Sequence, residues 1–208
     1  MKHFTILSVL VGINLAAQAT TINAPSSLIG NDALSGDNAY SWGISIAEPS
    51  GQTITSATID FSGITLSAAN STGIGYLYTD LLNSQATGVT VASDGDAVGD
   101  YWATKFSGAN ITALGSTKFA SVGTTLSWSY VLNSAQLAAL NSYLVSGVFN
   151  IGIDPDCHYN VGSISFTYTT SPAPSNVPDV ATTATLLLLG LGAAELLRRR
   201  SVLARAKA

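Results

Sequence analysis

Apolar residues alternate with small or polar residues through the middle of the chain, at a period of two. This alternation is typical of β-strands that bury one face and expose the other. A weaker run of the same kind covers Tyr101 to Phe106. Gly, Ser, Thr and Asn fill the intervals between the runs and favour turns. The clear runs predict strands over residues 40–46, 57–66, 126–132, 149–153 and 164–168.

The alternation changes phase inside the stretch 57–66. Apolar side chains fall on odd positions up to Phe61 and on even positions from Ile64, and Gly63 stands between them. One extra residue in a strand reverses which side chains face the core, and glycine adopts the backbone conformations that such a residue often needs. The pattern therefore predicts a β-bulge at Gly63.

One stretch has the features of a helix instead. Asn133 can cap its first turn, Gln136 stands at the reciprocal position of a capping box, and Gly147 can end it. An apolar face at helical spacing would cover one open end of the sheets, and consists of Leu137, Leu140 and Leu144. A shorter helical turn around Thr79 to Asn83 is a further candidate.

The first 19 residues have the order of a cleavable secretory signal. Lys2 and His3 precede an apolar core, and a small-x-small cleavage site follows it, with Ala17 and Ala19 as its small residues. An uncleaved N-terminal anchor is the alternative. Polar residues inside the core and the cleavage site after it favour removal of residues 1–19.

A second apolar run, Val180 to Leu197, lies near the other end of the chain. It is 18 residues long. As a helix it would span about 27 Å, near the minimum for a bilayer core. A basic cluster follows it and favours the cytoplasmic side, where residues 201–208 would form a basic end. The cluster consists of Arg198, Arg199 and Arg200.

The signature Val177-Pro178-Asp179, this apolar run and the arginine cluster together resemble a PEP-CTERM sorting signal, in the variant that begins Val-Pro-Asp. The signal would span residues 177–200. Asp179 and Val180 stand where the commonest form has Glu-Pro. The resemblance implies that an exosortase-type transpeptidase recognises the signature and cleaves near it. The protein would pass through the inner membrane, held by its C-terminal helix, to the cell surface or extracellular matrix. A permanent anchor is the alternative.

Many short strands and one main helix indicate a mainly β chain, built as an antiparallel, jelly-roll-like β-sandwich. This exported domain would span residues 20–170. A Pro- and Ser-rich linker over residues 171–176 separates it from the sorting signal. The domain also resembles exported domains that often precede this tail, in the stretches 39–43, 78–83 and 153–159, and that resemblance implies architecture without chemistry.

The predicted domain and its linker carry few bases. Between residues 20 and 175 the sequence has ten acidic residues and two basic ones, Lys105 and Lys118. Nucleic acid and anionic lipid bind to clustered Lys and Arg, so neither is an expected partner of the domain. Cations or neutral sugars suit such a surface better.

The sequence carries little that points to catalysis. After removal of the signal, His158 would be the single remaining histidine, and Cys157 is the single cysteine of the chain. Neighbouring side chains on an extended backbone point in opposite directions, so these two make a poor nucleophile–base pair. No hydrolase, metalloprotease or nucleotide-binding motif is present. The domain also lacks the close Glu and Asp array typical of sandwich glycosidases. We therefore expect a protein that is not an enzyme.

Two acidic stretches mix metal-ligand types. Asp154, Asp156, Cys157 and His158 could bind a transition metal, but their spacing matches no zinc pattern, and a turn with an inward, inert Cys explains them better.

The second stretch holds Asp94, Asp96 and Asp100. Ca²⁺ takes six to eight oxygen ligands, so a loop site is one interpretation and a solvated Asp/Gly turn is the favoured one. No other cofactor is expected.

The sequence thus favours a non-catalytic protein of the cell surface or extracellular matrix, in contact with extracellular polysaccharide. The alternative is a carbohydrate-binding module that the same tail displays, with Trp42, Trp102, Trp128 and the tyrosines as its sugar-stacking face. These tryptophans lie on alternating runs, where aromatic side chains more often belong to the core. A hydrolase that uses Asp side chains is the third option.

Overall fold

The computed structural model of the chain describes residues 19–46, 52–69, 74–95 and 99–172. The predicted signal cleavage residue Ala17, Asp96, and the sorting signal with its apolar run and arginines lie outside these residues. The described chain is mainly antiparallel β-structure in two sheets. Its compact unit ends at Ser171, and residues 172–208 form a second unit.

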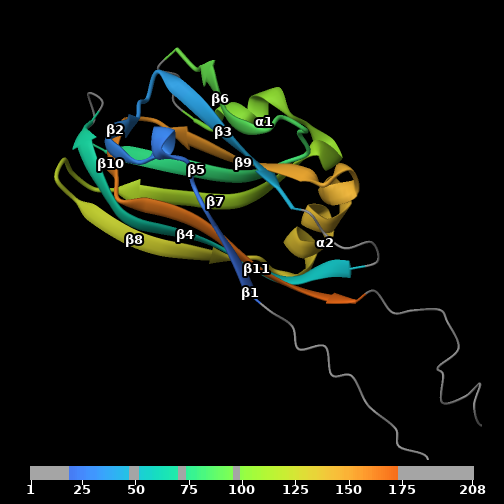
Figure 1. Ribbon diagram of the computed structural model, residues 1–208. Helices are drawn as coiled ribbons and strands as arrows, with labels where there is room; N and C mark the ends of the chain where they lie inside the picture. The colour runs from blue at the N-terminus through green and yellow to red at the C-terminus, as the bar shows by residue number, and fades with distance from the viewer. Residues whose placement is uncertain (1–18, 47–51, 70–73, 96–98, 173–208) are drawn as a thin grey trace, which may run out of the picture. The chain divides into compact units, whose positions relative to one another are not determined.

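The first sheet, sheet A, has six strands (Figure 1). In spatial order they are β1 (Ala19–Asn23), β11 (Ser163–Pro172), β4 (Gln52–Ala68), β10 (His158–Val161) and β2 (Gly30–Leu34), and β8 (Thr125–Val131) pairs with β4. Sheet B has five strands. Their order is β6 (Gly88–Ser93), β3 (Asn38–Ser45), β9 (Val148–Pro155), β5 (Gly75–Leu82) and β7 (Ile111–Phe119).

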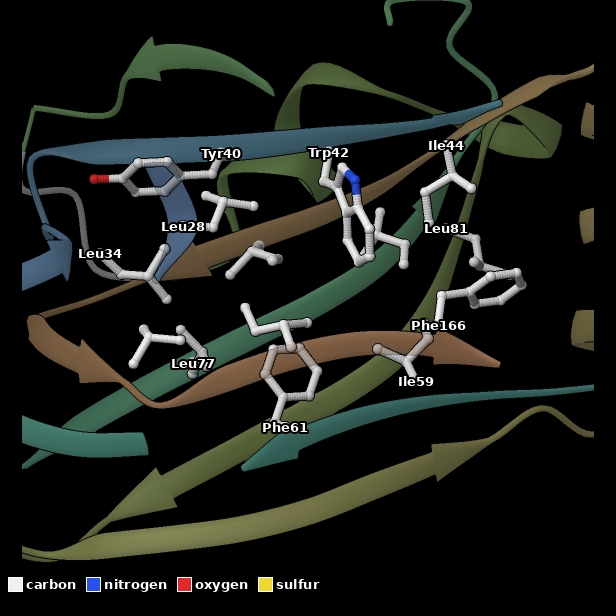
Figure 2. Packing of buried hydrophobic residues seen from close by; sticks show 14 of the residues in the cluster. Leu28, Leu34, Tyr40, Trp42, Ile44, Ile59, Phe61, Leu77, Leu81 and Phe166 are labelled. Atoms are coloured by element: carbon white, nitrogen blue, oxygen red, sulfur yellow. The ribbon is translucent and has the colours of Figure 1, made fainter. Parts of the chain in front are cut away.

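The core lies between the two sheets. Figure 2 shows Trp42 from β3 pointing toward Ile59 and Phe61 from β4, while the ring of Tyr40 extends toward the end of the core where Leu34 lies. Side chains with the period of two fill this layer, and most of them are almost fully buried. The strands predicted from alternation are therefore confirmed, because a pleated strand sends every second side chain to the same face.

The predicted bulge is also confirmed. The register between β4 and β8 shifts between Phe61 and Ile64, and both side chains remain buried. Gly63 adopts a φ of 62° at this point, and its N–H donates to Ser127 Oγ at 2.9 Å. The left-handed conformation is available to glycine at little steric cost, so one residue absorbs the change of phase.

The main helix, α2 (Ser134–Tyr143), has the predicted capping box. The side chain of Asn133 accepts from the N–H of Gln136, and the Gln136 side chain accepts from the N–H of Asn133. A 3₁₀ turn, η3 (Leu144–Ser146), follows, and Gly147 ends it with a φ of 79°. The helix lies at one end of the sheets, where Leu140 is fully buried (Figure 1).

Two predictions of local structure are wrong. The residues Tyr101 to Phe106 form a short helix, α1 (Tyr101–Lys105), because the Asp100 carboxylate accepts from the N–H of Ala103 and caps it. The residues Thr79 to Asn83 belong mostly to β5. This strand pairs with β9 on one side and β7 on the other, so both ladders hold its backbone extended. Two more 3₁₀ turns are η1 (Ser26–Leu28) and η2 (Gly108–Asn110).

The two ends of the described chain meet in sheet A. Ala19, the last residue of the predicted signal, pairs with Thr169 of β11. Strand β11 continues to Pro172, two residues into the predicted linker. Among the described residues, no helix is long and apolar enough to cross a membrane.

Candidate functional site

Strand β9 is buried on both of its faces. Ile151 and Ile153 point into the core, so Gly152 and Asp154 point to the outer face of sheet B. There α1 covers them on the side away from sheet A, with Trp102 in a second small apolar cluster (Figure 1). The part of this outer face around Gly152 and Asp154 thus lies under α1 rather than in water.

Two aspartates of neighbouring strands share this covered face. In the antiparallel pair of β5 and β9, Tyr78 is opposite Asp154 and Asp80 is opposite Gly152. Asp80 and Asp154 are therefore diagonal neighbours on one face. Asp80 is 1% exposed and Asp154 is 0% exposed. Both are acidic groups in a site that water does not reach.

The segment that leads into α1 is bonded to these strands through its backbone. The N–H of Tyr101 donates to Asp154 Oδ2 at 2.6 Å, and the N–H of Gly99 donates to Asp156 Oδ1 at 3.2 Å. Asp156 follows β9 directly and is 6% exposed. Asp100 lies between the two donors in sequence, so its carboxyl group is held near the same place.

Five aspartates make up what we call the acidic cluster: Asp80, Asp94, Asp100, Asp154 and Asp156. These like charges repel one another: besides burial, the charges of Asp94 and Asp100 raise the pKa values of both Asp154 and Asp156. Besides burial, the charges of Asp100 and Asp154 likewise raise the pKa of Asp80. Three parts of the chain supply them: β5, the end of β9, and the residues around 94–100.

Several oxygens of the cluster lack a hydrogen-bond donor within the part of the chain that the structure describes. They are Asp154 Oδ1, Asp156 Oδ2 and both oxygens of Asp80, which are bonded to Asp100 only when a proton lies between the two carboxyl groups. The two lysines of this part lie over tyrosine rings, Lys105 Nζ at 5.2 Å from the centroid of Tyr101 and Lys118 Nζ at 5.9 Å from that of Tyr76.

Burial raises the pKa values of these carboxyl groups. It raises the pKa of Asp80 to about 8, and the charge and hydrogen bonding of Asp100 and the charge of Asp154 act in the same direction. Burial also raises the pKa of Asp154 to about 7, although the N–H of Tyr101 opposes it. The pKa of Asp156 is raised by burial against the opposing N–H of Gly99. The neutral form is favoured because a buried charge has lost its hydration.

The structure joins two sites that the sequence presented separately. Asp94 and Asp100 come from one predicted site and Asp154 and Asp156 from the other, yet all four belong to the acidic cluster. Sequence reasoning missed Asp80. Its only signal was a lone acid in an otherwise buried strand, because Thr79 and Leu81 on either side face the core.

Cys157 and His158 have other surroundings. Cys157 is 3% exposed, and its Sγ lies 3.6 Å from the carbonyl oxygen of Ile74. His158 lies in β10, opposite Ala68 of β4. The interpretation of Cys157 as an inward, buried side chain is therefore confirmed.

The aromatic side chains divide into core and surface groups. Trp42 and Trp102 are 3% and 6% exposed, and the ring of Trp128 stacks on Phe61 with centroids 4.7 Å apart. Tyr76 and Tyr78 form a half-buried stacked pair on β5, with centroids 6.1 Å apart. The charges of Asp156, Asp100 and Asp154 help burial to raise the pKa of Tyr78, so this pair borders the acidic cluster.

Such a cluster can hold protons or a cation. Among the described residues, no group of three or more His, Cys, Asp or Glu side chains is already arranged to hold a metal ion. Comparison of the sequence with models of known protein families and with curated proteins found no match.

Proposed function

We propose that the protein is a non-catalytic component of the cell surface or extracellular matrix, exported and then sorted by an exosortase-type transpeptidase. The observation that carries the proposal is the order of three parts in one tail: Val177-Pro178-Asp179, the apolar run of residues 180–197, and the arginines that follow. An apolar tail can hold a chain in the membrane until an enzyme cleaves before it.

The organisation of the chain supports this proposal. The compact unit ends at Ser171, so the signature lies six residues beyond it, in a Pro- and Ser-rich stretch. An enzyme that acts near Val177 would leave the sheets intact. At the other end, cleavage after Ala19 would leave residues 20–23 of β1 paired with β11. We also propose that the two sheets of the exported domain have a jelly-roll-like topology.

The intact mass of protein extracted from the cell surface tests the sorting step. We expect a mature chain that lacks residues 180–208, cleaved near Val177 to Asp179. Replacement of Arg198, Arg199 and Arg200 by Gln should leave unprocessed protein in the membrane, whereas Arg205→Gln, outside the cluster, should be processed normally. A wild-type mass that retains the arginines would instead identify a permanent anchor.

The second candidate is a carbohydrate-binding module on the same tail. Tyr76 and Tyr78 favour it, because two half-buried rings on adjacent outward positions of one strand offer an aromatic platform. Binding of the purified protein to a glycan array, lost in Tyr76→Ala, would establish this activity. Val131→Ala, which removes part of a side chain that is 72% exposed, is the matched surface control.

A further inference from the structure

We propose that the acidic cluster binds a divalent cation of the Ca²⁺ type, between the outer face of sheet B and the segment that leads into α1. The ligands would come from Asp80 on β5, Asp154 and Asp156 at the end of β9, and Asp100 at the start of α1. This assignment goes beyond the proposed sorting and display of the protein.

The cluster holds acidic groups that are buried with almost no donors. Asp80 is 1% exposed, and the only donor its oxygens have within the described residues is a proton shared with the Asp100 carboxyl group. A buried carboxylate without a partner is strongly unfavourable, so such groups are normally paired, protonated or bound to a metal. The side chain is directed into the cluster, since, besides burial, the charges of Asp100 and Asp154 raise its pKa.

In Asp154 and Asp156 the two oxygens of each carboxylate have different surroundings. Asp154 and Asp156 each use one oxygen to bind a backbone N–H, which fixes the side chain, and each leaves the other oxygen without a donor. Together with the two oxygens of Asp80, this makes four buried oxygens that no N–H or O–H group of the described residues occupies, apart from a proton shared with Asp100. The N–H groups hold the segment before α1 against the strands that supply those oxygens.

The chemistry of these donors selects the ion. All of them are carboxylate oxygens, and Cys157 and His158 lie elsewhere, so a hard cation is favoured over zinc or copper. Ca²⁺ accepts six to eight oxygens in irregular arrangements at about 2.3–2.6 Å. Mg²⁺ demands near-octahedral geometry at shorter distances, which carboxylates fixed on two strands and a helix terminus satisfy poorly.

The side chains must move to enclose the ion. No three of them are arranged for it among the described residues. Binding would therefore draw Asp100 and the start of α1 toward β9, and we expect a weak site, with a Kd of about 10⁻⁴–10⁻³ M as in extracellular modules. Extracellular Ca²⁺ would fill such a site only if the protein is exported, which rests on the proposed function.

A shared proton is the competing explanation. Asp80 and Asp100 can hold one proton between them, which would relieve their repulsion without any ion. The two explanations differ in one respect. Only the cation site makes stability depend on Ca²⁺, because a ligand that binds the folded state stabilises it in proportion to its occupancy.

The test is thermal unfolding of the full-length chain in detergent, freed of metal with EDTA and then titrated with CaCl₂ or MgCl₂. At ten times Kd we expect Ca²⁺ to raise Tm by about 3–6 °C. Mg²⁺ should raise it less. Tb³⁺, a luminescent substitute for Ca²⁺, should bind and be excited by Trp102 or Tyr101, and Ca²⁺ should displace it.

Variants assign the effect to the cluster. Asp80→Asn should abolish the rise in Tm and the Tb³⁺ signal, while Asp60→Asn on β4, whose carboxylate accepts from Ser129, should retain both. If Asp80→Asn fails to fold, Asp156→Asn takes its place.

Equal melting in Ca²⁺ and EDTA, or a Ca²⁺ effect undiminished in a folded cluster variant, would overturn the proposal. Because the purified chain needs no sorting for this test, failure here leaves the mass measurement of the tail unaffected.

Discussion

The indole ring of Trp102 lies directly against the backbone of Gly152. A Cβ added to Gly152 would lie 2.7 Å from Cδ1 of that ring and 3.1 Å from its Cγ. Glycine thus permits α1 to approach β9 closely enough for the N–H of Tyr101 to reach Asp154 at 2.6 Å. Because Gly152 has no Cβ, α1 can lie close to β9, and the acidic cluster forms beneath the helix.

We predict that Gly152→Ala destabilises the protein by about 1–3 kcal/mol, because Trp102 must be displaced from a packed site. Urea denaturation measures the loss. In a Trp102→Ala background the same substitution should have a much smaller effect, since the contact is gone and the two changes are not additive. Equal losses in both backgrounds would mean that the ring does not set the distance.

The buried carboxyl groups predict how stability depends on pH in the absence of cations. The pKa of Asp80 is about 8 in the folded chain and that of Asp154 about 7, both above the ordinary 3.8. The folded state therefore binds protons that the unfolded state has lost, and stability falls as pH rises from about 4 to 8.

Each of these carboxyl groups contributes a slope of up to about 1.4 kcal/mol per pH unit. Urea denaturation in EDTA at pH 5, 6, 7 and 8 measures it. Asp80→Asn, which is neutral at every pH, should make the decline shallower, and Asp60→Asn should leave it as in the wild type. Stability that is constant over this range would show that the acids are solvated.

Cys157→Ser should leave the fold intact, with a loss of roughly 1 kcal/mol, because the thiol is 3% exposed and packs as a small apolar group. Thermal unfolding measures the change. Non-reducing gels of the wild-type protein should show a monomer, since the buried sulfur cannot reach another molecule. A disulfide-linked dimer that Cys157→Ser removes would contradict this prediction.

Asn133→Ala should cost about 1 kcal/mol, because it removes the cap that accepts from the N–H of Gln136. Urea denaturation of the variant beside Ser134→Ala gives the comparison. Ser134 is exposed and lies one residue further along, so its substitution should change stability by less than about 0.5 kcal/mol. Equal effects of the two would show that the box contributes little.

The strands, the bulge and the main helix were predictable from the sequence because their signals are local. Tyr40, Trp42 and Ile44 mark the face of β3 that points into the core, although Ala39 and Ser41 on the other face are buried as well. The phase change at Gly63 needs only its neighbours, and the capping box needs residues three apart. Where one face of a strand packs on the core and the other is exposed to water, the period of apolar side chains is enough to predict the strand.

Tertiary structure decided the rest. Tyr101 to Phe106 could alternate as a strand, and becomes α1 because Asp100 and Asp154 bind its first N–H groups. Thr79 to Asn83 could turn as a helix, and is mostly strand because β7 and β9 pair with it on both sides. The cap from Asp100 to Ala103 is local, whereas Asp154 and the two strands that pair with β5 are contacts that no local window contains.

The acidic cluster is the clearest case. The sequence placed Asp94 and Asp100 in one loop and Asp154 and Asp156 in another. The hydrogen bonds from backbone N–H groups to carboxylates that join the two stretches link residues 53 and 57 positions apart. Their meeting with Asp80 depends on the register of β5 against β9 and on the cover provided by α1. The sequence alone determined that the body is acidic; only the folded chain removed those acids from water, because burial depends on what packs above a face and not on the residues along it.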